Sequence, residues 1–134
     1  MLLAGTAFLA SSGCAAFRSK SEIDAAFADL EALLEAGNQS DAVEIAKRMK
    51  VGSYALLETH ESFVTQFDSS ARNRGVAASD LHAIVDDYLA SRKSQRDEIL
   101  RMQDELHAAI PASAWQEIHE VLTRKVDAVA AGTV

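Results

Sequence analysis

The sequence predicts an all-α protein, an up-and-down antiparallel bundle of about four helices with a long central hairpin. Apolar residues recur at alternating spacings of three and four along most of the chain, which is the period of an amphipathic helix. One proline and six glycines interrupt 134 residues, too few for the frequent turns of a β-sandwich. One segment rich in Ser, Asn and Gly separates two long periodic stretches, which predicts the hairpin. The length suits a single domain with a real core.

The first predicted helix begins at Ser21, whose hydroxyl can cap it with Asp24 three residues on. Gly37 is expected to end this helix as a glycine just beyond the last turn. Its apolar stripe consists of Ile23, Phe27, Leu30 and Leu34.

The second predicted helix begins at Asp41, with Glu44 as its capping partner. Gly52 lies inside its apolar stripe, and two interpretations stay open. The helix breaks there, since glycine costs about 1 kcal/mol relative to alanine in a helix, or it continues and another group must come close to the glycine. The stripe comprises Ile45, Met49, Leu56, Thr59, Phe63 and Gln66, with Phe67 beside its end.

Residues 68–79 are the predicted loop, and the third predicted helix runs from Asp80 to about Ile110, where Pro111 ends it. Ser113 and Gln116 form the predicted capping box of a fourth helix that ends at Gly132. The core side of the third helix holds Leu81, Val85, Tyr88, Ile99, Met102 and Leu106, and that of the fourth holds Trp115, Ile118, Leu122, Val126 and Val129.

The lengths of these helices predict an uneven molecule. The two central helices are each close to 30 residues, or about 40–45 Å, and the outer two are about half as long. Short connections make sequence neighbours antiparallel, so both outer helices pack at the same end of the hairpin. We therefore expect a four-helix bundle at one end and a two-helix projection at the other.

The projection gives the first candidate site, an interaction surface for a homodimer or a protein client. A two-helix hairpin buries one stripe per helix, so apolar groups at its end should stay partly exposed until a partner covers them. The alternative is that the second helix breaks near Gly52 and its pieces fold back, which would make the same residues ordinary core. The candidate residues are Phe63, Phe67, Leu81, Val85 and Tyr88.

The N-terminus carries the other strong signal. Residues 1–13 contain no charge and include a run of about ten mostly apolar residues, too short to span a bilayer but suited to a signal peptide. Ser11, Ser12 and Gly13 lead into Cys14, the one cysteine, and "SSGC" resembles the lipobox of bacterial lipoproteins. The resemblance implies cleavage before Cys14, lipid on its thiol and a tether over residues 14–20, ahead of a helical domain over 21–131. A buried thiol in a core helix and a secreted protein without lipid are the alternatives.

The second half of the chain, "LHAIVDDYLASRKSQRDEILRMQDELHAAIPASAWQEI", resembles small helical envelope lipoproteins whose last helix opens on a turn ending in Trp, here Trp115. Members of that group have no assigned activity. The resemblance to lipoproteins implies a membrane partner through the lipid anchor, and the absence of Asp directly after Cys14 implies the periplasmic face of the outer membrane.

Several function classes lack support in the sequence. A net charge of −7 with scattered bases argues against a nucleic-acid partner. Asp104 and His107 form the one acid–histidine pair at i,i+3 spacing, and a single pair cannot hold a di-metal centre. The adjacent acids Asp86 and Asp87 point about 100° apart on a helix, which does not suit acid–base work on one substrate. We expect neither an enzyme nor a cofactor.

A polar layer in the hairpin is the remaining candidate. Arg92 and Gln95 occupy positions where the periodicity of the third predicted helix predicts apolar residues. A hairpin symmetric about Arg74 would place Gln95 opposite Gly52. The arginine could bind an anionic small ligand there through two hydrogen bonds, or the layer could set the helix register. The sequence thus predicts a lipid-anchored, non-catalytic protein that binds another protein, with a ligand-binding or sensing bundle as the alternative.

Overall fold

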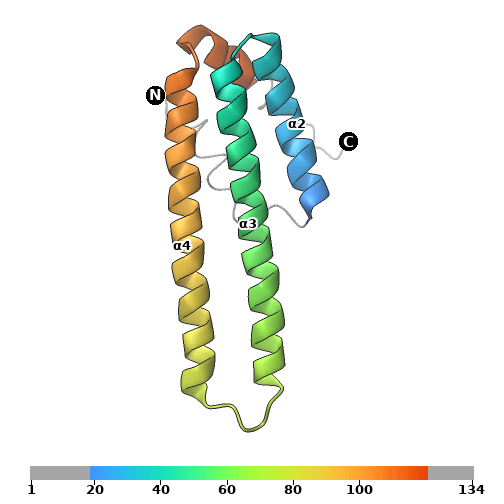
Figure 1. Ribbon diagram of the computed structural model, residues 1–134, viewed down its shortest axis with the longest axis vertical. Helices are drawn as coiled ribbons and strands as arrows, with labels where there is room; N and C mark the ends of the chain where they lie inside the picture. The colour runs from blue at the N-terminus through green and yellow to red at the C-terminus, as the bar shows by residue number, and fades with distance from the viewer. Residues whose placement is uncertain (1–18, 121–134) are drawn as a thin grey trace.

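A computed structural model describes residues 19–120, and this part of the chain is helical with no strand among its residues. Helix α2 spans Lys20–Ala36, α3 spans Ser40–Ala71 and α4 spans Ala78–Ala109, and residues 112–120 are helical as well. The long helices α3 and α4 run antiparallel, and α2 lies beside one half of α3 (Figure 1). The predicted all-α up-and-down bundle with a long central hairpin is confirmed.

Helix α2 follows the predicted stripe but not the predicted cap. Its four stripe residues, from Ile23 to Leu34, are buried. The N-cap is Ser19, whose hydroxyl accepts a hydrogen bond from the Glu22 N–H at 3.3 Å, so the Ser21 cap was wrong. At the other end Gly37 has an ordinary φ of −85°, and the left-handed residue is Asn38, with φ 55°. Asparagine tolerates this conformation better than most residues.

Helix α3 begins one residue earlier than predicted and has no side-chain cap. The Gln39 N–H donates to the Leu34 carbonyl at 2.9 Å. This bond closes a tight turn, directly after which α3 begins at Ser40. Glu44 forms an ion pair with Lys47 at 3.0 Å instead of closing a capping box. The capping box at Asp41 was therefore wrong, although Asp41 still places a negative charge in the first turn.

Gly52 does not break the helix. Helix α3 continues through it for 32 residues. A Cβ atom at Gly52 would lie 3.3 Å from Ile99 Cγ1 and 3.3 Å from Met102 Cε on α4. Close approach of the neighbouring helix therefore explains the glycine, and the folded-back bundle is excluded.

The connection between α3 and α4 is shorter than the predicted loop of residues 68–79. It covers residues 72–77, because both helices extend into the Ser-rich flanks. The Asp68 carboxylate accepts from Arg72 at 2.9 Å across the last turn of α3, and Asn73 Oδ1 accepts from the Gly75 N–H at 3.0 Å in the turn itself.

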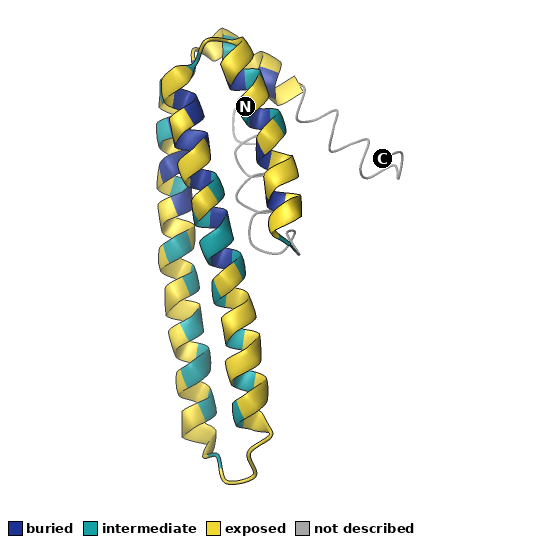
Figure 2. Ribbon diagram, turned by 45° about the vertical axis from the view of Figure 1, so that its right-hand side comes forward, coloured by how far each residue is buried: buried dark blue, intermediate teal, exposed yellow. Residues whose placement is uncertain are grey.

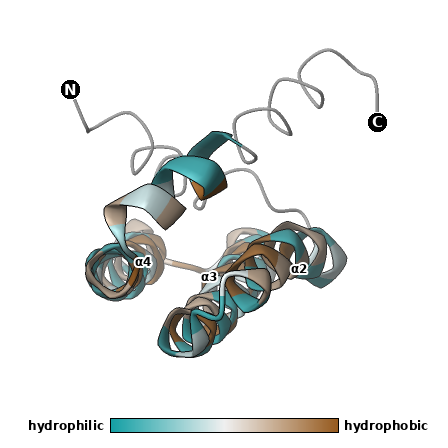
Figure 3. Cartoon of the chain, turned by 90° about the horizontal axis from the view of Figure 1, so that it is seen from above, coloured by the Kyte–Doolittle hydropathy of each residue, from teal (hydrophilic) through white to brown (hydrophobic). Residues whose placement is uncertain are grey.

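The core occupies one end of the molecule, where α2, α3, α4 and residues 112–120 meet (Figure 2). Residues 112–120 cross this end of the bundle (Figure 3), and Ile110 and Ile118 contribute to its core. The Trp115 N–H donates to the Pro111 carbonyl at 3.0 Å, so the helix starts before Ser113 and the predicted Ser113 cap was wrong. The predicted stripe from Leu122 to Val129 lies outside the described residues.

Candidate functional site

The candidate site is the half of the α3–α4 hairpin that extends away from the core, residues 57–98, which we call the distal hairpin. Every one of these residues is described, and none of them is buried. The last buried residues on either side are Leu56 on α3 and Ile99 on α4. The predicted two-helix projection is thus present, and no other described element packs along its length (Figures 1 and 2).

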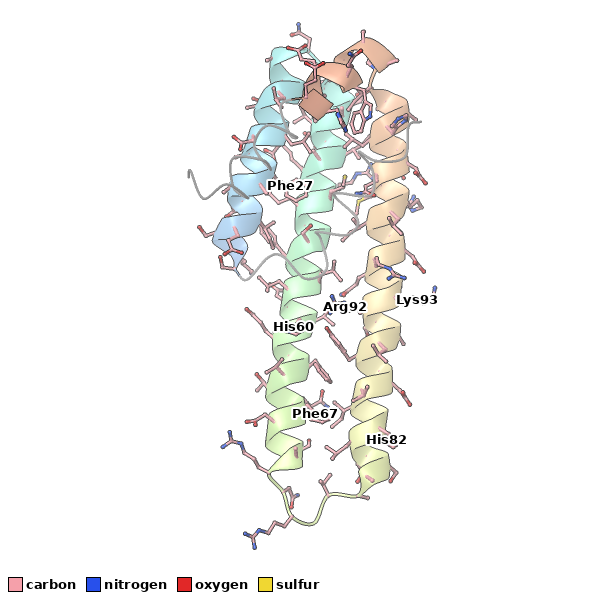
Figure 4. All side chains as sticks on the ribbon, turned by 180° about the vertical axis from the view of Figure 1, so that it is seen from behind. Phe27, His60, Phe67, His82, Arg92 and Lys93 are labelled. Atoms are coloured by element: carbon pink, nitrogen blue, oxygen red, sulfur yellow. The ribbon has the colours of Figure 1, made fainter. Side chains whose placement is uncertain are left out.

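Aromatic side chains form the centre of the distal hairpin. The rings of Phe63 and Tyr88 stack across the two helices, with centroids 4.1 Å apart and planes 12° apart. Phe67, one turn beyond Phe63 on α3, adds a tilted contact at 5.6 Å, and it lies between the two helices (Figure 4). All three rings remain half-buried.

Further apolar residues continue this surface. Val85 and Leu81 are half-buried one and two turns before Tyr88 on the same helix. Val64 and Leu89 are 49% and 55% exposed, which places them on the outside of the hairpin. The five residues predicted for the interaction surface therefore share the distal hairpin, and each keeps part of its surface in water.

Polar side chains surround Tyr88 on the side toward the core. His60 Nδ1 lies 3.0 Å from the Tyr88 hydroxyl. The Arg92 guanidinium donates to the same hydroxyl and lies 5.8 Å from the ring centroid. One turn further, Gln95 Nε2 donates to Thr59 Oγ1 at 2.8 Å. The His60 and Gln95 contacts join α3 to α4, whereas the Arg92 contact stays within α4.

The predicted polar layer does not assemble as expected. Gly52 faces Ile99 and Met102, one turn beyond Gln95 toward the core, and Gln95 pairs with Thr59 instead. Arg92 turns along its own helix toward Tyr88. The prediction assumed a hairpin symmetric about Arg74, whereas close packing of α4 against Gly52 sets the register. Gln95 Oε1 is nevertheless buried and has no hydrogen-bond partner.

A groove of about 440 Å³ runs along one face of the distal hairpin beside the aromatic stack. Its lining includes Phe63 and Tyr88 together with the carboxylates of Glu58 and Asp87, and no Lys or Arg lines it. Lys20, at the start of α2, forms an ion pair with Glu58 at 2.7 Å. Because this ammonium donates its hydrogen bond to a carboxylate, the pKa of Lys20 is raised. The start of α2 thus lies at the core-side end of the groove.

The sequence identified the rings but missed their polar neighbours. Thr59 was counted with the apolar stripe, His60 was not considered for the site, and Asp87 was considered only with Asp86 as an acid pair. The signal for His60 was its position three residues before Phe63, which puts the two side chains on neighbouring faces of the helix. The signal for Asp87 was weaker, since its contact with the groove depends on the register of two helices.

The other chemical candidates stay apart. Asp104 and His107 are both exposed, and the His107 ring contacts Trp115 edge-on at 5.2 Å. Among residues 19–120, no group of three or more His, Cys, Asp or Glu residues is placed to hold a metal ion. Asp86 and Asp87 are exposed side by side on α4.

The lipid-anchor prediction concerns residues 1–18, so Cys14 lies outside the described residues. Within the described part, no helix combines the length and the apolar character that crossing a bilayer requires. Comparison of the chain with protein-family models, with curated proteins and with solved structures gives no match.

Proposed function

We propose that this chain is a lipid-anchored helical protein of the bacterial envelope, and that it binds another protein through the distal hairpin without catalysing a reaction. The observation that carries the binding proposal is the absence of any buried residue from 57 to 98, although this segment contains Phe63, Phe67 and Tyr88. Half-exposed aromatic rings gathered on one projection are typical of interaction surfaces.

The energetics favour a covered state of the distal hairpin. Each apolar side chain that moves from water into an interface contributes about 25 cal/mol per Å² of buried area. The distal hairpin offers three rings and at least four aliphatic side chains on a helical frame that is already formed. A preformed frame loses little conformational entropy on binding, so more of this gain remains as affinity.

Photo-crosslinking tests the binding proposal. A photoreactive amino acid would replace Val64 or Leu89, both exposed on the distal hairpin, and Val51, which is 62% exposed outside it, as a matched control. We expect protein adducts in living cells from Val64 and Leu89 and none from Val51. Equal labelling at the three positions, or labelling at Val51 alone, would contradict the proposal.

The envelope location rests on Cys14 and the small residues before it. A stable anchor requires two or more acyl chains, and the lipoprotein pathway supplies them. Growth of a bacterial host with an alkyne-bearing fatty acid is expected to label the wild-type protein and not a Cys14→Ser variant. Sucrose-gradient separation of the two membranes should then recover the labelled protein with the outer membrane. Equal labelling of both proteins would refute lipidation at Cys14.

A second candidate function is the binding of a small ligand in the groove. The observation that favours it is Gln95 Oε1, a buried acceptor without a partner beside the groove. A ligand that donates an N–H or O–H bond would satisfy this oxygen. Native mass spectrometry of the protein purified from cells should then show a bound small molecule that is lost in a Gln95→Met variant. If both proteins show only the mass of the chain without a bound small molecule, this function is contradicted.

A further inference from the structure

We propose that the lipid anchor at Cys14 holds this protein lengthwise along the bilayer, with one flank of the distal hairpin against the lipid headgroups. The inference rests on the lipidation of Cys14 under the proposed function, and it adds how the molecule lies on its membrane. Three features support it: the place where α2 begins, the length of chain between Cys14 and that place, and the polar character of one flank of α3.

Helix α2 begins beside the middle of α3 and runs toward the end of the molecule that holds the core, which we call the core end (Figure 1). The Lys20 ammonium lies 2.7 Å from the Glu58 carboxylate and 5.5 Å from the centroid of the Tyr54 ring. Nearer the core end, Lys50 of α3 pairs with Glu31 of α2 at 2.8 Å. The tether therefore joins the folded domain at mid-length and not at either end.

The tether is too short to reach past the core end. From Cys14 to Lys20 an extended chain spans at most about 20 Å. Along α3, Glu58 lies about 27 Å from the start of the helix at Ser40, and residues 112–120 cross the core end beyond it (Figure 3). A protein anchored at Cys14 therefore cannot stand on its core end with the distal hairpin pointing away from the membrane.

Standing on the tip of the hairpin is excluded for the same reason. Glu58 lies about 20 Å from the end of α3 at Ala71, and the connection over residues 72–77 extends further. An upright hairpin would therefore need more chain than the tether has, and a random coil of this length spans only about 12–15 Å on average. The tether allows poses in which the long axis of the molecule lies along the bilayer.

The flank of α3 on the α2 side is polar along the distal hairpin. Tyr54 and Glu58 lie beside the start of α2, and the same helical face continues as Glu61, Thr65 and Ser69. These three residues are exposed, and only polar residues line the hollow that they form with Glu58 on α3. Polar groups lose free energy when they enter hydrocarbon without partners. The flank is therefore suited to contact with headgroups and not to insertion.

Electrostatic attraction does not supply this orientation. Residues 57–98 include eight acidic and five basic residues, so an anionic lipid surface repels the distal hairpin as a whole. The tether alone is expected to hold the flank at the bilayer, which makes the closeness depend on tether length. The stacked rings of Phe63 and Tyr88 belong to the seam between α3 and α4, so contact of the flank with headgroups leaves them open to a protein partner.

Energy transfer tests this inference on the full chain, expressed and processed in bacteria and reconstituted from detergent into phosphatidylcholine vesicles. A donor dye is attached at Ser69→Cys on the flank or at Glu117→Cys, which is exposed at the core end, and the acceptor dye is on lipid headgroups. Because lipid occupies the Cys14 thiol, the introduced cysteine is the one that reacts with the dye. We expect similar transfer efficiency from both positions. Insertion of about 20 Gly and Ser residues before Ser19 doubles the mean span of the tether and should lower the transfer from both positions at least about twofold.

Strong transfer from one position and none from the other would overturn the inference, because the protein would then stand upright. Transfer that is unchanged by the inserted residues would overturn it as well, since adsorption and not the anchor would hold the protein at the surface. The intact mass of the wild-type protein separates this inference from the proposed function. If the mass includes acyl chains and the transfer contradicts the lengthwise pose, only this inference fails. If the mass lacks them, the proposed lipidation fails and this inference fails with it.

Discussion

Gly52 shows how one residue sets the distance between two helices. Its missing side chain leaves room for Ile99 and Met102, which would each lie 3.3 Å from a Cβ atom there. Alanine gains about 1 kcal/mol in helix propensity, and the flexible Met102 methyl can move a few tenths of an ångström. We expect Gly52→Ala to leave the free energy of unfolding within about 1 kcal/mol of wild type, as measured by urea titration.

A larger side chain at the same position cannot be accommodated by so small a movement of Met102. Gly52→Leu is expected to lose about 1–3 kcal/mol of unfolding free energy, because it overpacks the contact with α4. Gly75→Leu in the connection is the control, since a Cβ atom there meets only Asn73 Oδ1 at 3.5 Å. Equal effects at the two glycines would mean that α4 does not approach Gly52 closely.

Asn38 is the other residue whose backbone decides local structure. Its φ of 55° lies in the left-handed region, which costs a β-branched residue about 1–2 kcal/mol. Asn38→Val should therefore lower the midpoint of urea unfolding, whereas Asn38→Gly should leave it close to wild type. A neutral valine variant would show that the turn between α2 and α3 is not held in this conformation.

At the scale of the element, the two halves of α3 have different roles. Met49 is 1% exposed in the core half, and Phe67 is half-buried in the distal half. Met49→Ala should cost about 2–5 kcal/mol of unfolding free energy through the cavity it leaves. Phe67→Ala should cost less than Met49→Ala, because part of the Phe67 ring already faces water.

Hydrogen exchange gives an independent view of the same contrast. Amides in the core half of α3 should exchange only through global unfolding, and amides near Phe67 should exchange through local opening. Equal protection along the whole helix at low concentration would contradict the division of α3 at Leu56.

At the scale of the whole molecule, the protein is a short helical bundle from which the distal hairpin extends. The bundle buries its apolar residues, and the distal hairpin keeps its aromatic rings half-exposed beside a groove that Glu58 and Asp87 line.

Much of the candidate site follows from periodicity. Phe63 and Tyr88 were predicted to face the same seam from helical spacing, and their rings stack. The polar contacts of Gln95 were not predicted, because they depend on a register between helices that no spacing within one helix contains. The caps at Ser21, Asp41 and Ser113 failed for a related reason: several nearby residues can cap a helix, and the path of the entering chain selects among them.

Periodicity and composition were enough to predict the helical class, the long hairpin and the uneven division of apolar residues along it. These properties are local or depend only on helix length, so spacing and composition are sufficient to predict them. Three features became visible only in the folded chain: α3 continues through Gly52, Gln95 contacts Thr59, and Glu58 and Asp87 line one groove. Each of these depends on how closely and in what register two helices pack, and that is a balance of contacts between residues about 30–50 positions apart.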